Sequence, residues 1–138
     1  MVVLQFFGPR PGNPPAVPGG GLMASNPPPP EVAALLRAAC YDCHSYETKF
    51  PWYSHVAPVS WLLASHINGA RDVMNFSDWP HDDPALERGA LKHIVHQVET
   101  GRMPLASYTW MHPVARLTPE QRKQLADWAA KAAAAVKD

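Results

Sequence analysis

Apolar residues recur at helical spacing in four stretches of the chain, the first of which begins at Glu31. Its apolar positions are Val32, Leu35, Leu36 and Ala39. Steps of three and four residues place these side chains on one face of a helix. We therefore expect a helix that runs from Glu31 directly into Cys40.

The second stretch predicts a helix from Pro58 to Ala70, with the proline in the first turn, where its missing N–H does no harm. The residues expected on its apolar face are Val59, Leu62, Leu63, His66 and Ile67. Because an amphipathic helix normally turns its apolar face towards the core, we expect these side chains to point inwards.

The last two helices carry clear start signals. Asp83-Pro84 is a cap followed by a proline, and the helix that it opens should end near Gly101. Thr118-Pro119-Glu120-Gln121 is a capping box with proline at the first helical position. The expected inward stripes are Leu91, Ile94, Val95 and Val98 in the former helix, and Leu125, Trp128, Ala129, Ala132 and Val136 in the latter. No stretch alternates as a half-buried strand would, so we predict an all-α domain.

Composition sets residues 1–30 apart. Residues 8–30 hold nine of the 16 prolines and five of the 8 glycines. Such a stretch favours extended, semi-rigid geometry and is not expected to bury apolar area. We therefore divide the chain into a linker over residues 1–30 and one folded domain over residues 31–138. Met1 to Phe7, apolar apart from Gln5, is either the trimmed end of a membrane anchor or an apolar tail without fixed structure.

Charge argues against two kinds of partner. Twelve basic and twelve acidic side chains balance, and no polybasic run occurs. The sequence therefore offers no electrostatic footprint for nucleic acid or for an anionic membrane surface.

The chemistry of the chain is concentrated in Cys40-Tyr41-Asp42-Cys43-His44, which contains both cysteines. Two cysteines three residues apart and followed by histidine match the pattern for c-type haem attachment. The two thiols can bond to the two vinyl groups of one porphyrin as thioethers, and the adjacent His44 then reaches the iron as its proximal ligand. We predict one covalently bound haem c.

Two other kinds of site could use the same cysteines. A zinc site would need His93 and His96, but the 49 residues 44–92 separate them from Cys43, far more than in a zinc finger. Both histidines also lie off the apolar stripe of their helix. A redox-active dithiol normally lies in a βαβ unit, which the predicted elements lack. Haem attachment is the favoured interpretation.

The ligand on the other side of the iron is expected to be Met103, in Gly101-Arg102-Met103-Pro104. A thioether on a proline-stiffened loop after a helix is held in place, and methionine raises the reduction potential. The alternatives are His66, Met74, Met111 or an open coordination position.

Further stretches add to the five-residue motif. They are Ala39 to Ser45, Glu47-Thr48, Pro51 to Ser54, Ala57 to Trp61, Asn75 to Ser77, Met103 to Leu105, Ser107-Tyr108, His112-Pro113 and Asp127-Trp128. Together they resemble the bacterial haem-binding domain family, a group of small c-type cytochrome-like domains, over residues 31–131. Two departures are Tyr46, where asparagine is common, and Ala106, where proline often follows Met-Pro-Leu. Ala106 leaves the methionine loop less rigid.

The resemblance implies thioethers at Cys40 and Cys43, and an iron bound by His44 and Met103. It implies a small cytochrome c-like helical domain wrapped around one covalent haem. It also implies an exported protein with an N-terminal hydrophobic segment.

Polar-tipped aromatic residues near these ligands are expected to line the haem pocket: Trp52, Tyr53, Trp61, Tyr108 and Trp110. Their rings can cover the porphyrin while an N–H or O–H bonds to a propionate. Arg102 and Arg71 are candidates for pairing with a propionate. The ring N–H of His44 should donate to a backbone carbonyl, for which Pro58 and the nearby loop are candidates.

With both axial positions filled by protein, the iron has no vacancy for a substrate. We therefore expect an electron carrier rather than an enzyme, with redox proteins as partners. The main alternative is a haem-based ligand sensor or peroxidase-like enzyme with a labile distal ligand. A third is a structural or partner-binding domain in which haem completes the core. Because bacteria form the thioethers outside the cytoplasm, the expected location is the periplasm, with a membrane tether if the apolar start belongs to an anchor.

Overall fold

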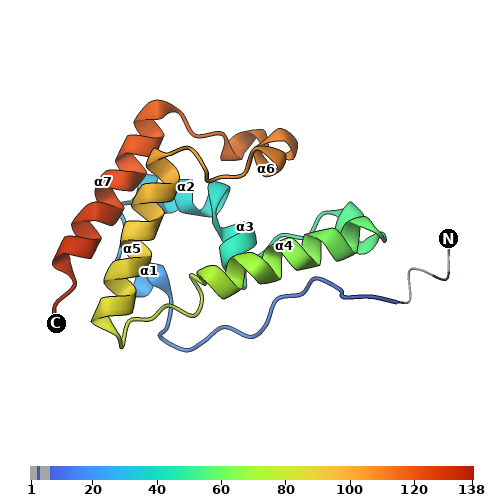
Figure 1. Ribbon diagram of the computed structural model, residues 1–138, viewed down its shortest axis with the longest axis horizontal. Helices are drawn as coiled ribbons and strands as arrows, with labels where there is room; N and C mark the ends of the chain where they lie inside the picture. The colour runs from blue at the N-terminus through green and yellow to red at the C-terminus, as the bar shows by residue number, and fades with distance from the viewer. Residues whose placement is uncertain (1–2, 4–6) are drawn as a thin grey trace.

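The computed structural model describes residue 3 and residues 7–138, and helices dominate the fold (Figure 1). The elements are α1 Leu22–Ser25, α2 Pro30–Ala39, α3 Tyr41–His44, the 3-10 turn η2 Trp52–His55, α4 Val59–Val73, α5 Pro84–Glu99, α6 Ala106–Met111, the 3-10 turn η3 Pro113–Ala115 and α7 Pro119–Ala135. The described part of the chain contains no strand. The prediction of an all-α domain is confirmed.

Helices α5 and α7 begin where their caps predict. The Asp83 carboxylate accepts hydrogen bonds from the backbone N–H groups of Ala85 (3.1 Å) and Leu86 (3.0 Å). At α7, the Gln121 N–H donates to the Thr118 hydroxyl (3.1 Å), and the Thr118 N–H donates to the Gln121 side chain (2.9 Å). Each cap satisfies N–H groups that have no partner inside the helix, which explains why local sequence decides these starts.

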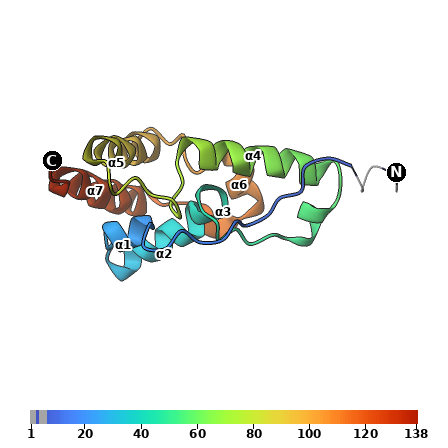
Figure 2. The same ribbon diagram turned by 90° about the horizontal axis from the view of Figure 1, so that it is seen from below.

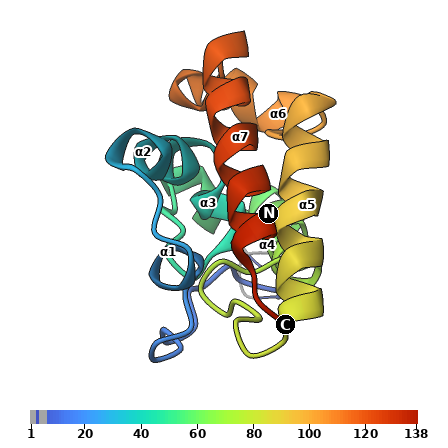
Figure 3. The ribbon, with the colours of Figure 1, turned by 90° about the vertical axis from the view of Figure 1, so that its left-hand side faces the viewer.

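Helices α5 and α7 lie side by side and form one wall of the core, and α2 packs across α7 (Figure 1, Figure 3). The fully buried stripe residues are Leu91, Ile94 and Val98 of α5, and Leu125 and Ala129 of α7. The other predicted stripe residues, Val95, Trp128, Ala132 and Val136, are partly buried against this core. The inward stripes of both helices are confirmed.

Helix α4 extends away from the α5–α7 pair (Figure 1, Figure 2). Its buried residues are Ser60, Ala64 and Ile67. Leu62 is 59% exposed, Val59 is 44% exposed, and His66 is also exposed. The prediction that these three face the core is therefore wrong. Ile67 of the predicted stripe is buried as expected, together with the small residues Ser60 and Ala64, whereas Val59, Leu62 and His66 face outwards.

The proline-rich segment is partly built into the domain. Leu22 is completely buried in the core. The Leu22 N–H donates to the Phe76 carbonyl (2.8 Å), and the Trp79 N–H donates to the Gly20 carbonyl (2.7 Å). The expectation that residues 8–30 bury no apolar area is therefore wrong at Leu22, since a short helical turn after three glycines brings this leucine inwards.

None of the described helices has both the length and the apolar character needed to cross a membrane. The prediction made for Met1 to Phe7 falls outside the described residues, apart from Val3 and Phe7.

Candidate cofactor site

A cavity of about 360 Å³ lies between α3, α4, α5 and the loop after α5. Its lining is mostly apolar and consists of Cys40, His44, Ser65, His66, Gly69, Ala70, Val73, Met74, Phe76, His93, Ile94, Gln97, Val98, Met103 and Leu105. This size is typical of cofactor pockets. Three of the predicted site residues, Cys40, His44 and Met103, thus meet at one cavity although they are far apart in sequence.

The cavity explains the unusual orientation of α4. His66, Gly69 and Val73 lie on the predicted apolar stripe or its continuation, and all three line the cavity. Val73 is 70% exposed. Across from this stripe, α6 buries none of its residues (Figure 1). The open apolar surface of α4 along this cavity is what a flat, largely apolar group such as haem would cover.

His44 is held in the orientation that a metal ligand needs. Its Nδ1 lies 2.9 Å from the Met74 carbonyl and 3.1 Å from the Ala70 carbonyl, both at the C-terminal end of α4. A ring that donates from Nδ1 keeps the lone pair of Nε2 available for iron. The expectation that Pro58 or its loop supplies the acceptor is wrong, because the end of α4, not its beginning, packs on His44.

The electrostatics of His44 favour the neutral ring. Burial lowers the pKa of its imidazole, the Met74 and Ala70 carbonyls act in the opposite direction, and the nearby His93 lowers the pKa again. The Phe76 ring lies against the imidazole, with centroids 5.6 Å apart and planes 30° apart. The Phe76 N–H also donates to the His44 carbonyl (2.6 Å). A neutral, clamped imidazole suits iron ligation.

Both thiols are in surroundings that keep them protonated. Burial raises the pKa of Cys40 to about 12, with a further contribution from Cys43. Burial and the Asp42 carboxylate raise the pKa of Cys43 to about 11. Zinc binding and dithiol redox chemistry use thiolates, which need the opposite shift. Cys40 lines the cavity, whereas Cys43 is half-buried beside it.

Met103 is half-buried, and its backbone is fixed on both sides. Its N–H donates to the Gln97 carbonyl (3.1 Å) near the end of α5. Its carbonyl accepts from the Arg122 guanidinium of α7 (3.0 Å), which also donates to Val98 (3.1 Å). The loop therefore presents the Met103 side chain to the cavity from a backbone tied to both core helices.

The alternatives for the distal position are placed differently. His66 lines the cavity from α4. Met74 lines it too, but its carbonyl accepts from the His44 ring, so it belongs to the His44 side of the cavity. Met111 is 50% exposed and is not part of the lining.

The other residues predicted for the haem pocket are not part of the cavity lining. They are Trp52, Tyr53, Trp61, Tyr108, Trp110 and Arg102. Trp52 and Trp110 are 79% and 75% exposed. The Trp61 ring lies against Gly8 of the N-terminal segment, where a Cβ would collide with the indole. Tyr108 instead donates from its hydroxyl to Asp42 (2.6 Å). Trp52, Tyr53 and Trp61 follow the cysteine motif in sequence, and Arg102, Tyr108 and Trp110 flank Met103, but none of them is part of the lining.

Arg71, a candidate for pairing with a propionate, makes four hydrogen bonds within the protein. Its guanidinium donates to the carbonyls of Ser45 (2.9 Å) and Gly12 (2.8 Å), and to the side chains of Asn13 (2.9 Å) and Thr48 (3.1 Å). It thereby ties the segment after the cysteine motif and the N-terminal segment to the end of α4.

Sequence reasoning missed His93 and Gln97 as cavity residues. They lie one turn apart on α5, next to the buried Ile94 and Val98. The sequence shows these two polar residues beside the inward stripe of the helix. A polar pair in this position is common on a solvated helix face, so it does not by itself indicate a cavity.

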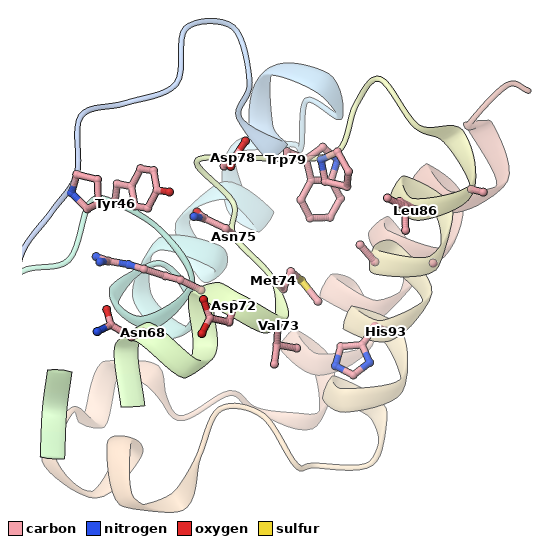
Figure 4. Close-up of a pocket in the computed structure, with 16 residues that line it drawn as sticks. Tyr46, Asn68, Asp72, Val73, Met74, Asn75, Asp78, Trp79, Leu86 and His93 are labelled. Atoms are coloured by element: carbon pink, nitrogen blue, oxygen red, sulfur yellow. The ribbon is translucent and has the colours of Figure 1, made fainter. Parts of the chain in front are cut away.

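A second hollow of about 790 Å³ adjoins the cavity, and Val73, Met74 and His93 line both. Its wall is more polar and includes Tyr46, Asn68, Asp72, Asn75 and Asp78. Figure 4 shows His93 projecting from α5 beside the end of α4, where Val73 and Met74 lie. His93 therefore lies between the apolar cavity and the more polar hollow.

Comparison with known proteins gives one match. The sequence model of a family described as "Haem-binding domain" matches residues 1–131. No curated protein and no solved structure matches the chain.

Proposed function

Because the chain belongs to the haem-binding domain family and so binds haem, we propose that it is a c-type cytochrome that transfers electrons through a single haem. The observation that carries the proposal is that Cys40, His44 and Met103 line one apolar cavity. The haem, when bound, would supply a one-electron couple between ferric and ferrous iron.

The chain has residues for covalent attachment. The S–H groups of Cys40 and Cys43 would add across the two vinyl groups, so that each forms a C–S bond and no atom is lost. The raised pKa values of both thiols argue against a cation site, because metal ligation uses the thiolate.

The axial ligands proposed are His44 and Met103. The carbonyls at the end of α4 orient the His44 ring and increase its basicity. The fixed backbone of Met103 presents a thioether, which favours the ferrous state relative to a second histidine. With both positions filled by side chains of the protein, a small ligand must displace one of them to bind.

Mass spectrometry under denaturing conditions, together with a visible spectrum, tests the proposal. The chain is produced in a bacterium that matures c-type cytochromes, and we expect a mass equal to the polypeptide plus one intact haem. The ferric protein should show the weak sulfur-to-iron band in the red. A Cys40→Ala, Cys43→Ala variant is the control and should lose the haem under the same denaturing conditions. A wild-type mass equal to the polypeptide alone would refute covalent attachment.

A sensor or peroxidase-like role is the second candidate. It is favoured by the sparse packing of α6, which follows Met103 and buries no residue. Mixing the ferrous protein with carbon monoxide, and the ferric protein with peroxide, separates the two functions. An electron carrier should bind both slowly and weakly, whereas rapid binding supports a labile distal ligand.

We also propose a periplasmic location, a tether at the N-terminus and redox proteins as partners, since maturation of c-type haem occurs outside the bacterial cytoplasm. Haem staining of periplasmic, membrane and cytoplasmic fractions tests the location. Haem-stained protein confined to the cytoplasm would contradict it.

A further inference from the structure

The part of the loop that follows Met103 is weakly attached to the rest of the domain. We define the distal loop as residues 102–111, which comprise Met103 and α6. Its near end is fixed by the Met103 backbone contacts with Gln97 and Arg122. Beyond that point α6 packs mainly on η3 and buries none of its residues. Packing alone therefore provides little to hold the far end of the loop closed.

A side-chain hydrogen bond supplies the missing attachment. The Tyr108 hydroxyl on α6 donates to Oδ2 of Asp42 (2.6 Å). Among the residues that the structure describes, this is the one side-chain hydrogen bond that joins α6 to the cysteine motif. Asp42 lies between the two cysteines and two residues before His44. The bond therefore joins the loop that bears the distal ligand to the segment that bears the proximal one.

Both partners of this bond are themselves held in place. The Tyr108 ring stacks on His112, with centroids 4.2 Å apart and planes 14° apart. The other carboxylate oxygen of Asp42 accepts from the Lys49 N–H (3.0 Å). Burial and the bond to Asp42 raise the pKa of the Tyr108 hydroxyl, so it remains a donor at neutral pH. A donor and a charged acceptor that are both restrained make a strong, specific bond.

We propose that Tyr108 and Asp42 are positioning residues that close the distal loop over the haem and so set the strength of the Met103 sulfur–iron bond. This rests on the proposed His44/Met103 ligation. Tyr108 follows Met103 by five residues. When Tyr108 is bound, residues 104–108 are held over the Met103 side chain. When Tyr108 is released, these residues can move outwards, and the Met103 side chain can then leave the iron while its own backbone stays attached to Gln97 and Arg122.

The test compares Tyr108→Phe with Tyr46→Phe in the haem-loaded protein. Tyr46 is a matched control because the substitution also removes one hydroxyl, and its ring packs on Arg71 away from the distal loop. The measurements are the sulfur-to-iron band and the affinity of the ferric protein for imidazole, which competes with methionine. Loss of a hydrogen bond to a charged group should raise imidazole affinity about tenfold or more in Tyr108→Phe. Tyr46→Phe should match the wild type.

Asp42→Asn tests the same bond from the other side. Its amide offers one acceptor oxygen in place of two, so it cannot serve both Tyr108 and Lys49 as the carboxylate does. If the two residues act as a pair, the double variant should bind imidazole no more tightly than the stronger single variant. The single variant Asp42→Asn also provides the measurement if Tyr108→Phe accumulates no haem-loaded protein.

The outcomes separate this proposal from the proposed function. A wild type with the sulfur band and a Tyr108→Phe variant with unchanged imidazole affinity would overturn the positioning role and leave His/Met ligation intact. A wild type with covalent haem but no sulfur band would refute Met103 ligation, and the positioning role with it. Glu87, on α5, accepts hydrogen bonds from Trp79 and Asn26, which lie outside the distal loop. Glu87→Ala removes both bonds and should leave imidazole affinity unchanged, which excludes general loss of stability as the cause.

Discussion

Gly69 offers the sharpest test of where the haem lies. It is a glycine inside α4, and a Cβ built on it meets no atom within 4 Å. Gly69 lines the cavity, so a larger side chain at this position would extend into the space proposed for the haem. A glycine in the middle of a helix costs about 0.5–1 kcal/mol relative to alanine, and the chain alone gives no reason to accept this cost. We infer that the space above Gly69 is needed for the haem.

The perturbation is Gly69→Leu, and the matched control is Gly89→Leu. Gly89 lies inside α5, a Cβ there also meets nothing within 4 Å, and it faces the polar hollow rather than the cavity. Both changes should improve helix propensity by about 0.5–1 kcal/mol. In Gly69→Leu, overpacking against the rigid porphyrin should cost about 1–3 kcal/mol, which weakens the distal bond roughly 5- to 150-fold.

The assay is haem content, the sulfur-to-iron band and thermal unfolding of the haem-loaded proteins. Gly89→Leu should keep full haem content and unfold up to about 4 °C higher than the wild type. Gly69→Leu should lose haem or the sulfur band. A Gly69→Leu protein with full haem content, an unchanged band and higher stability would show that the haem does not lie over this part of α4.

Three further predictions follow from the same geometry. Met103→Leu should abolish the sulfur band, while Met111→Leu and His66→Gln should retain it; a band that survives in Met103→Leu would identify another ligand. Glu87→Ala should lower the free energy of unfolding by about 1–3 kcal/mol in urea titrations, because Oε1 of this buried carboxylate accepts from both Trp79 (2.8 Å) and Asn26 (2.7 Å), and alanine leaves both donors without it. A variant as stable as the wild type would show that these bonds add nothing. Protein made without the haem-attachment machinery should lack a cooperative unfolding transition by circular dichroism, because α4 and α6 leave apolar surface open; a compact, cooperatively unfolding apoprotein would contradict a haem-completed core.

Local signals account for what the sequence predicted well about the fold. The caps at Asp83 and Thr118 depend on hydrogen bonds within three residues, so the starts of α5 and α7 could be predicted from the local sequence. The stripes of these helices are buried because the two helices pack on each other. Short elements such as α1, α3 and α6 were not predicted, since four to six residues carry too little periodicity to be recognised.

The face of α4 shows where periodicity stops being informative. The pattern correctly indicated an amphipathic helix, but it could not say whether protein or a cofactor covers the apolar side. Leu62 and His66 are exposed because the polypeptide supplies no neighbour for them. For the same reason, sequence proximity to the ligands assigned aromatic residues to the pocket, although Trp52 and Trp110 are exposed and are not part of the cavity lining.

The sequence by itself determined the all-α class and the Cys-Tyr-Asp-Cys-His motif, because helical periodicity, caps and the spacing of Cys40, Cys43 and His44 involve only a few consecutive residues. Its longer pattern also determined the family. Only the tertiary structure decided that Met103 shares a cavity with His44, that the end of α4 orients the His44 ring, and that Tyr108 bonds to Asp42. Each of these depends on the path of the backbone between segments 26 to 66 residues apart, and local interactions do not specify that path.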